Sequence, residues 1–250
     1  IGSLNGLYTY QLKSRQLNHF DSKQTGLPHN TIYSVIQTKD NQIYIGTYNG
    51  LCRYVQASGK FENILLPVNR GGSNLFVNSL LEDTTRQCIW IGMEGYLFQY
   101  NPTTGEMKAI EVFHNNSIKS LALDGDENLL ADNGLYVYQN DKEPLQHIIH
   151  DSRNIQSLTN NIIWNIFSDQ EHNIWLGTDY GISLSRYNSA LQFVPISQIT
   201  GTGDGNQFYS LFRDSKGFYW FGGTNGVIRF THPAGNKHDA IWYRMGDKKH

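Results

Sequence analysis

The stretch Leu176-Gly177-Thr178-Asp179-Tyr180-Gly181-Ile182 decides the fold, because variants of it recur along the chain. The clear copies are Ile45-Gly46-Thr47-Tyr48-Asn49-Gly50-Leu51, Phe221-Gly222-Gly223-Thr224-Asn225-Gly226-Val227 and the opening Ile1-Gly2-Ser3-Leu4-Asn5-Gly6-Leu7, with looser copies around Gly95 and Gly134. The turn glycines Gly6, Gly50, Gly95, Gly134, Gly181 and Gly226 are 44, 45, 39, 47 and 45 residues apart. A strand-built period of about 40 to 45 residues is the length of one four-stranded propeller blade.

Each clear unit repeats the same internal order of elements. An inner strand such as 30–38 is followed by a turn, a second strand, a Gly hairpin that needs positive φ, a third strand and a polar outer strand. Asn30 to Gly46, Asn161 to Gly177 and Asn206 to Gly222 each span sixteen residues. We therefore predict an all-β protein, a β-propeller of four-stranded blades, with about six blades or an arc of a larger propeller.

The repeats divide the chain into a single propeller region, 1–250. We place a partial blade at 1–20 and fuller blades at approximately 27–66, 74–113, 116–150, 158–196 and 205–245. Ile1 already lies in a predicted second strand, so we expect the chain to be a piece of a longer protein. Two units depart from the pattern: Leu75 replaces the Asn that opens the inner strand, and Ala131 stands where the other units carry Gly.

Composition argues against several classes of function. A formal net charge of -2 gives no reason to expect a nucleic-acid partner. The sequence contains no run of eighteen apolar residues, so we expect no membrane span in it. The two cysteines, Cys52 and Cys88, are expected to be buried small hydrophobic residues.

Asp124-Gly125-Asp126-Glu127-Asn128 resembles the start of a Ca²⁺ loop, but Leu129 replaces the required Gly, so a hairpin turn is expected there. His147 and His150 have no Glu or Cys beside them that could complete a metal site. We expect no metal and no cofactor.

Two segments resemble a known repeat. Asn161 to Asp169 followed by Asn173 to Ile182, and Ser210 to Gly226, are similar to the two-component regulator propeller repeat, and the leaders 26–30 and 157–161 also match it. The resemblance implies the periplasmic sensor region of a hybrid two-component histidine kinase of Bacteroides type, which detects products of polysaccharide breakdown. It also implies that the whole protein is anchored in the inner membrane, with the kinase outside this chain.

Candidate ligand contacts follow from the strand order of a blade. The loops that lead into the inner strands share one face with the hairpins between the second and third strands. The predicted oligosaccharide contacts on this face are Tyr33, Tyr48, Lys119, Trp164, Asp179 and Tyr209. Aromatic faces with Asn, Asp and Lys suit carbohydrates, which present C–H patches and many hydroxyls. The alternative for Tyr33, Trp164 and Tyr209 is packing between blades.

Other interpretations stay open at this point. Asn30, Asn161 and Asn206 are expected to make local turns, and Trp175 and Trp220 to lie in the core. Ser168, Asp169 and Trp175 resemble the Asp-box turn of sialidases, but no carboxylate pair marks the start of an inner strand, so we predict no catalytic residues. A propeller that binds a partner protein, or that forms a homodimer, is the main alternative, and a propeller enzyme that processes glycans is a further one.

Overall fold

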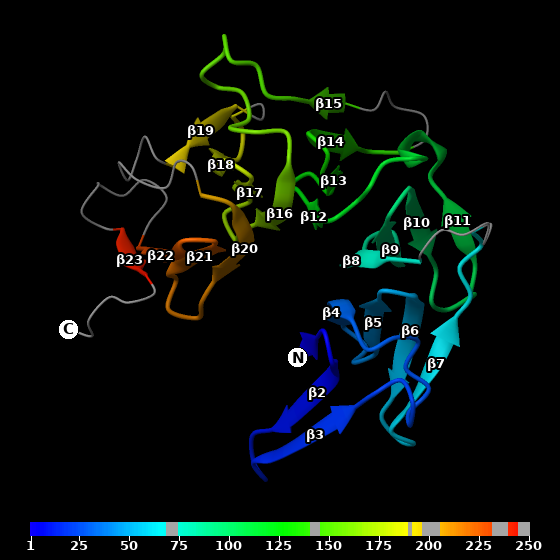
Figure 1. Ribbon diagram of the computed structural model, residues 1–250. Helices are drawn as coiled ribbons and strands as arrows, with labels where there is room; N and C mark the ends of the chain where they lie inside the picture. Colours follow the sequence, from blue (N-terminus) through cyan, green and yellow to red (C-terminus); the bar gives the residue numbers. More distant parts are fainter. Residues whose placement is uncertain (69–74, 141–145, 190–191, 197–205, 232–239, 245–250) are drawn as a thin grey trace. The chain divides into compact units, whose positions relative to one another are not determined.

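The computed structural model describes residues 1–68, 75–140, 146–189, 192–196, 206–231 and 240–244. Its fold is the predicted all-β propeller fold, built from one three-stranded and five four-stranded antiparallel sheets (Figure 1). The chain divides into two compact units, Ile1–Lys119 and Ser120–His250, and each unit contains three of the sheets. None of the helices in the described residues is long and apolar enough to cross a membrane.

The first unit begins with the partial blade. Its strands are β1 (Gly2–Ser3), β2 (Gly6–Gln11) and β3 (Gln16–Phe20); then β4 (Ile32–Gln37), β5 (Ile43–Thr47), β6 (Gly50–Val55) and β7 (Lys60–Ile64); then β8 (Val77–Asp83), β9 (Cys88–Met93), β10 (Tyr96–Tyr100) and β11 (Met107–Ala109). A short 3-10 helix, Glu111–Phe113, follows β11. The partial blade thus has three strands, and β1 pairs with β2 in the place of a second strand.

The second unit contains three four-stranded sheets. Their strands are β12 (Leu121–Leu123), β13 (Leu129–Ala131), β14 (Leu135–Tyr138) and β15 (Gln146–Ile148); β16 (Ile163–Ser168), β17 (Ile174–Thr178), β18 (Gly181–Ser185) and β19 (Phe193–Pro195); β20 (Phe208–Arg213), β21 (Tyr219–Gly223), β22 (Gly226–Phe230) and β23 (Ile241–Tyr243). Each sheet follows chain order, as a propeller blade requires.

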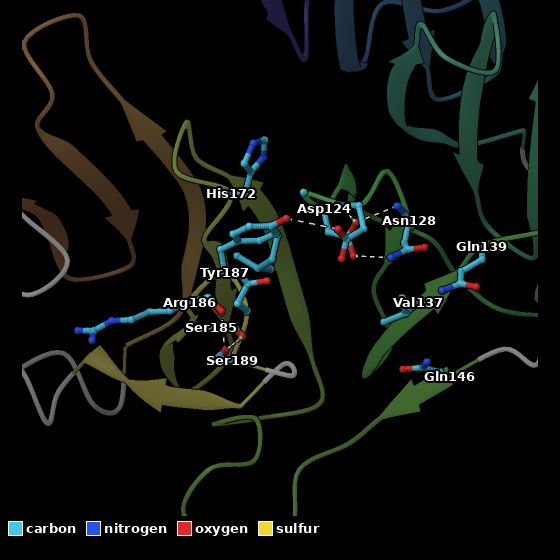
Figure 2. A pocket seen from close by; sticks show the side chains of 14 residues that line it. Asp124, Asn128, Val137, Gln139, Gln146, His172, Ser185, Arg186, Tyr187 and Ser189 are labelled. Atoms are coloured by element: carbon cyan, nitrogen blue, oxygen red, sulfur yellow. Dashed lines mark hydrogen bonds between the residues drawn. The ribbon is translucent and has the colours of Figure 1, made fainter.

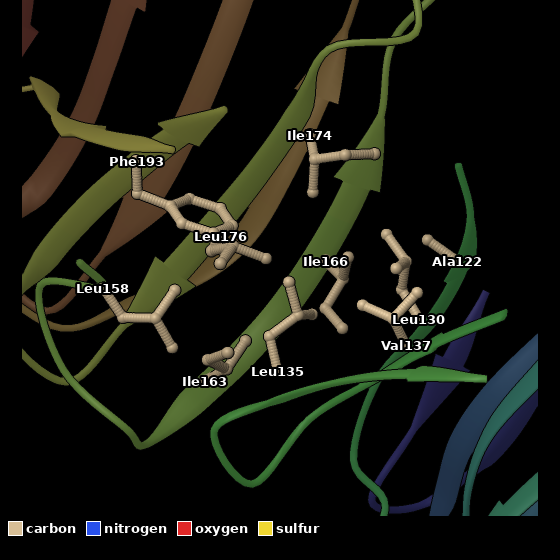
Figure 3. Close-up of a cluster of buried hydrophobic side chains, with 10 residues drawn as sticks. All are labelled: Ala122, Leu130, Leu135, Val137, Leu158, Ile163, Ile166, Ile174, Leu176 and Phe193. Carbon is tan, nitrogen blue, oxygen red and sulfur yellow. The ribbon is translucent and has the colours of Figure 1, made fainter. Parts of the chain in front are cut away.

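Apolar side chains from facing sheets form the core of each unit. Figure 3 shows one such cluster, in which Leu130 and Val137 of the sheet β12–β15 meet Ile166 and Leu176 of the sheet β16–β19. Trp175 continues the core toward the last sheet, where its ring centroid lies 4.8 Å from that of Tyr219. Because each sheet has two apolar faces, consecutive sheets bury what one sheet alone would expose.

The recurring Gly-x-x-x-Gly phrase has two physical causes. A Cβ on Gly177, the first glycine, would lie 2.6 Å from the backbone oxygen of Phe208 in the next sheet, so only glycine permits this close approach. Gly181, the second glycine, has φ +101°, which L side chains rarely adopt. The turn glycines also donate their N–H to the residue that opens the next repeat, in the pairs Gly6–Asn30, Gly50–Leu75, Gly95–Asn116, Gly134–Asn161 and Gly181–Asn206.

These contacts correct the expectation for the repeated asparagines. The side-chain oxygen of Asn30 accepts a hydrogen bond from the N–H of Ser22 at 2.7 Å, and that of Asn161 accepts one from the N–H of His150 at 2.6 Å. Asn206 accepts from the hydroxyl of Thr224 at 2.6 Å. The asparagines therefore tie together segments eight or more residues apart, and the local turns predicted for them are wrong.

The register of the degenerate blade also differs from expectation. Leu121 pairs with Ala131 as Ile166 pairs with Leu176, so Ala131 does not stand at the glycine position. Asp132 stands there instead, fully buried, and its carboxylate accepts the N–H of Ser120 at 3.0 Å. The shorter hairpin of this unit hides the shift from a sequence comparison.

Carboxylates at the ends of inner strands hold indoles of the second strands. Trp90, Trp175 and Trp220 donate their ring N–H to Asp83, Asp169 and Asp214 at 3.0, 2.8 and 2.8 Å. Trp175 is in the core as predicted, whereas Trp220 is only half-buried, which corrects the expectation for it. Cys52 and Cys88 are buried and free, and burial raises the pKa of the Cys52 thiol to about 12.

Candidate functional site

Four inner strands carry a β-bulge. In each, the bulged residue occupies the same position of the repeat, on the face predicted to bind the ligand. The register of pairing with the second strand skips Tyr33, Asn78, Trp164 and Tyr209. A bulge re-aims the side chain of its extra residue and often lies beside a binding site. Tyr33 is 46% exposed and Tyr209 44% exposed, so neither ring is buried in the core, although each contacts an aromatic ring of the adjacent blade, as the packing alternative from sequence expects.

In the second unit, three predicted residues meet in one cluster, which we call the Trp164 cluster: Trp164, Asp179, Gln207 and Tyr209. The indole N–H of Trp164 donates to Oδ1 of Asp179 at 2.7 Å. Its ring lies edge-on to that of Tyr209, with the centroids 5.3 Å apart. Two bulges on adjacent sheets, β16–β19 and β20–β23, therefore place two aromatic rings against each other.

Gln207 completes this cluster and was not predicted from the sequence. Its Nε2 donates to the same Oδ1 of Asp179 at 2.8 Å, and its Oε1 accepts the hydroxyl proton of Tyr209 at 2.5 Å. Oδ2 of Asp179 has no hydrogen-bond partner within the described part of the chain. Two donors thus fix the carboxylate while one oxygen remains available to accept a hydroxyl.

In the first unit, aromatic rings occupy the positions that correspond to Asp179 and Gln207. Tyr48 stands at the hairpin position of Asp179, and Phe76 leads into β8 as Gln207 leads into β20. The ring of Phe76 lies 4.4 Å from that of Tyr48 and 6.2 Å from that of Tyr33, both edge-on. The ring of His29 lies 4.8 Å from that of Tyr48. Tyr33 and Tyr48 therefore belong to one aromatic cluster, held together by Phe76, which the sequence reasoning missed.

Two further positions of the predicted face have different surroundings. Asn78, the bulged residue of β8, donates its amide to the backbone oxygen of Ile118 at 3.2 Å and so helps hold the next segment. Lys119 is half-buried and directly precedes the second unit.

The carboxylate of the Asp-box-like turn, Asp169, is held by hydrogen bonds to side chains of the core. Asp169 is 5% exposed and accepts hydrogen bonds from Trp175, Asn173 and, at 2.8 Å, the hydroxyl of Tyr219. Burial alone would raise the pKa of Asp169, but the hydrogen bonds outweigh it and hold the pKa below its ordinary value. The same carboxylate and burial raise the pKa of Tyr219. This carboxylate is a buried anion that joins two sheets.

The acidic turn Asp124 to Asn128 also forms the predicted hairpin turn. Oδ1 of Asp124 accepts the N–H groups of Asp126 and Asn128 at 2.9 and 2.8 Å, and Oδ2 accepts the Asn128 amide at 2.9 Å. His147 stacks on Tyr136 with the ring centroids 4.0 Å apart. No group of three or more metal-ligating side chains occurs among the residues that the structure describes.

The fold and the repeated bulges define a class of protein, a repeat propeller that presents side chains at the hairpin ends of its blades. The family described as two component regulator propeller matches residues 26–49, 157–180 and 202–225. The chain belongs to this two-component regulator propeller family.

Known structures and sequences agree with this assignment. Two crystal structures of one extracellular domain from B. thetaiotaomicron, assigned in one of them to a hybrid two component system, are 80% and 81% identical to this chain, with TM-scores of 0.72 and 0.73. They match over 99% of this chain, which spans only 33% and 34% of those chains. Histidine kinase P4 of Formosa agariphila is 26% identical over 212 residues, 77% of this chain and 15% of the kinase. A virginiamycin B lyase from Staphylococcus aureus, 12% identical with a TM-score of 0.70 over 98% of this chain and 79% of the lyase, shows the fold alone.

Proposed function

We propose that this chain is part of the periplasmic, ligand-sensing propeller of a hybrid two-component sensor histidine kinase. The extracellular domain at about 80% identity and the kinase from Formosa agariphila support this role. In this proposal the chain binds and does no chemistry, while the kinase and the membrane anchor belong to the longer protein. Homodimerisation of the whole sensor is part of the same proposal.

The ligand that we propose is an oligosaccharide released from a polysaccharide. The observation that carries this proposal is the Trp164 cluster, where two aromatic rings stand beside a carboxylate with one available oxygen. A sugar ring presents C–H groups that pack on aromatic faces and hydroxyls that need directed acceptors. Oδ2 of Asp179 supplies such an acceptor, and Gln207 holds it in place.

A binding screen with matched variants tests the proposal. The chain is titrated calorimetrically with a panel of neutral and acidic oligosaccharides, and each hit is repeated with Tyr209→Ala and Tyr243→Ala. Both tyrosines are 44% exposed and lie in the sheet β20–β23, but only Tyr209 is on a bulge. We expect Tyr209→Ala to weaken binding about tenfold, the effect of about 1.4 kcal/mol, and Tyr243→Ala to leave it unchanged.

Two results would contradict the proposal. Equal losses in both variants would show that the bulge has no special part in binding. The absence of any hit, together with stabilisation by a partner protein or a second copy of the chain, would favour the protein-interaction alternative. Ligand at about 100 times its dissociation constant should add roughly 2.7 kcal/mol of stability, so thermal unfolding checks each calorimetric hit independently.

A further inference from the structure

A groove lies between the sheets β12–β15 and β16–β19 (Figure 2). It sits where β12 and β18 end, beside Asp124 and Arg186, whereas Trp164 lies where β16 begins. Both walls belong to the second unit. Its volume of about 430 Å³ falls within the range of small-molecule sites. The groove is thus separate from the Trp164 cluster and at the opposite end of the strands.

The residues at this junction are smaller than their counterparts at the next one. At the next junction, between β16–β19 and β20–β23, the corresponding space is filled by Trp175 and Tyr219, which share Asp169. By strand register, Leu130 takes the place of Trp175, and Ile174 takes the place of Tyr219. The degenerate blade therefore lacks the indole, and the sheet β16–β19 lacks the phenol, that occupy the equivalent positions at the next junction.

The walls of the groove combine neutral polar groups with an apolar floor. The amides of Gln139 and Gln146 line one side, and the hydroxyls of Ser185 and Ser189 line the other, 2.9 Å from each other (Figure 2). Val137 and Ile174 are 4% and 3% exposed and form the floor. Such a surface offers hydrogen bonds in both directions together with contact for C–H groups.

One wall is rigid because Gly125 has no side chain. A Cβ on Gly125 would lie 2.5 Å from Cε2 of Tyr187 and 2.8 Å from Cβ of His172. The acidic turn therefore packs directly against the Tyr187 ring, whose hydroxyl donates to Asp126 at 3.4 Å. The ring of His172 lies 5.4 Å from Tyr187. The aromatic wall is thus held in place before any ligand arrives.

Two carboxylates and one guanidinium line the groove. Asp124 and Asp126 stand on its rim, and Figure 2 shows the side chain of Arg186 extending away from the labelled amides. An acidic ligand would approach two carboxylates. We propose that this groove is a second binding site, and that it takes a neutral, polyhydroxylated ligand of the saccharide class. The proposal does not depend on binding at the Trp164 cluster.

Nuclear magnetic resonance of the chain tests the two sites separately. His172 ring protons, assigned with His172→Gln, report on the groove, and the Trp164 indole N–H, assigned with Trp164→Phe, reports on the other cluster. The probes are glucose, galactose, mannose, xylose, maltose and cellobiose, with glucuronate as the acidic comparison. We expect at least one neutral sugar to shift the His172 signals in a saturable manner.

Variants decide where a sugar binds. Gln146 is exposed, so Gln146→Trp should fill the groove from its rim and weaken the His172 response about tenfold or more, which corresponds to about 1.4 kcal/mol. Trp164→Ala should leave that response unchanged. The proposal is overturned if no neutral sugar shifts His172, if glucuronate binds more tightly than the neutral sugars, or if Trp164→Ala removes the response while Gln146→Trp does not.

Discussion

Truncation of two tryptophans in one sheet should destabilise the chain to different extents. Trp175 is fully buried on β17, whereas Trp164 is the half-buried bulged residue of β16. Replacing a buried Trp by Ala costs about 3 to 5 kcal/mol, and Trp175→Ala also removes the 2.8 Å bond to Asp169. Trp164→Ala removes one bond to a carboxylate that keeps Gln207 as a donor, and one aromatic pair worth about 0.5 to 1.5 kcal/mol.

We therefore expect Trp164→Ala to cost about 1 to 2 kcal/mol and Trp175→Ala at least about 2 kcal/mol more. For a chain of this length the difference corresponds to about 4 to 8 °C in Tm. Thermal unfolding followed by circular dichroism measures both variants, and urea unfolding of the same samples checks that the slope is unchanged. Equal destabilisation by the two substitutions would refute the bulge argument, because Trp164 would then belong to the core.

Three further predictions concern the scaffold. Gly177→Ala should lower the unfolding free energy by about 1 to 3 kcal/mol, since its Cβ would press on the backbone oxygen of Phe208, and urea unfolding measures the loss. The folded pKa of Asp169 is lowered, so its stabilising contribution is present above about pH 4 and is lost as the pH falls through the folded pKa. Urea midpoints measured down to about pH 2.5 should accordingly fall less steeply for Asp169→Asn than for the unchanged chain, and parallel curves would contradict this. Cys52, buried and with its pKa raised to about 12, should react with iodoacetamide at about pH 8 only after unfolding, as mass spectrometry of the alkylated chain would show.

Most of the fold could be predicted from the repeated turn phrase, because the phrase reflects constraints that act inside each blade. Positive φ at Gly181 and close approach at Gly177 leave glycine as the suitable residue, so the spacing of glycines predicts the hairpins. Contacts between segments of one blade that are far apart in the sequence were harder to predict. Asn206 contacts Thr224 eighteen residues away, and the position of Asp132 depends on a hairpin of altered length.

The candidate clusters were predicted in part. Tyr33, Trp164 and Tyr209 were found by alignment, but the reason for their exposure, the bulge, was not. One signal was present: Ile163 and Ile166 are both buried and three residues apart, as are Phe208 and Leu211, whereas a regular strand buries every second residue. Gln207 lacked such a signal, because its contact with Asp179 crosses from one sheet to the next.

The bulge lies between the residues that pack the sheets together and the residues that differ from one repeat to the next. At one end of the inner strands, carboxylates and indoles such as Asp169 and Trp175 join the sheets, and a groove lies at the junction where Leu130 and Ile174 replace the indole and the phenol. At the other end, the bulged side chain leaves the alternation of the strand and makes no contribution to the ladder. The hairpin and leader positions beside the bulges also vary, since they carry Tyr48 and Phe76 in one unit but Asp179 and Gln207 in the other. A propeller built in this way can change the side chains that it presents blade by blade, because the varied residues and the packing residues lie at opposite ends of the same strands.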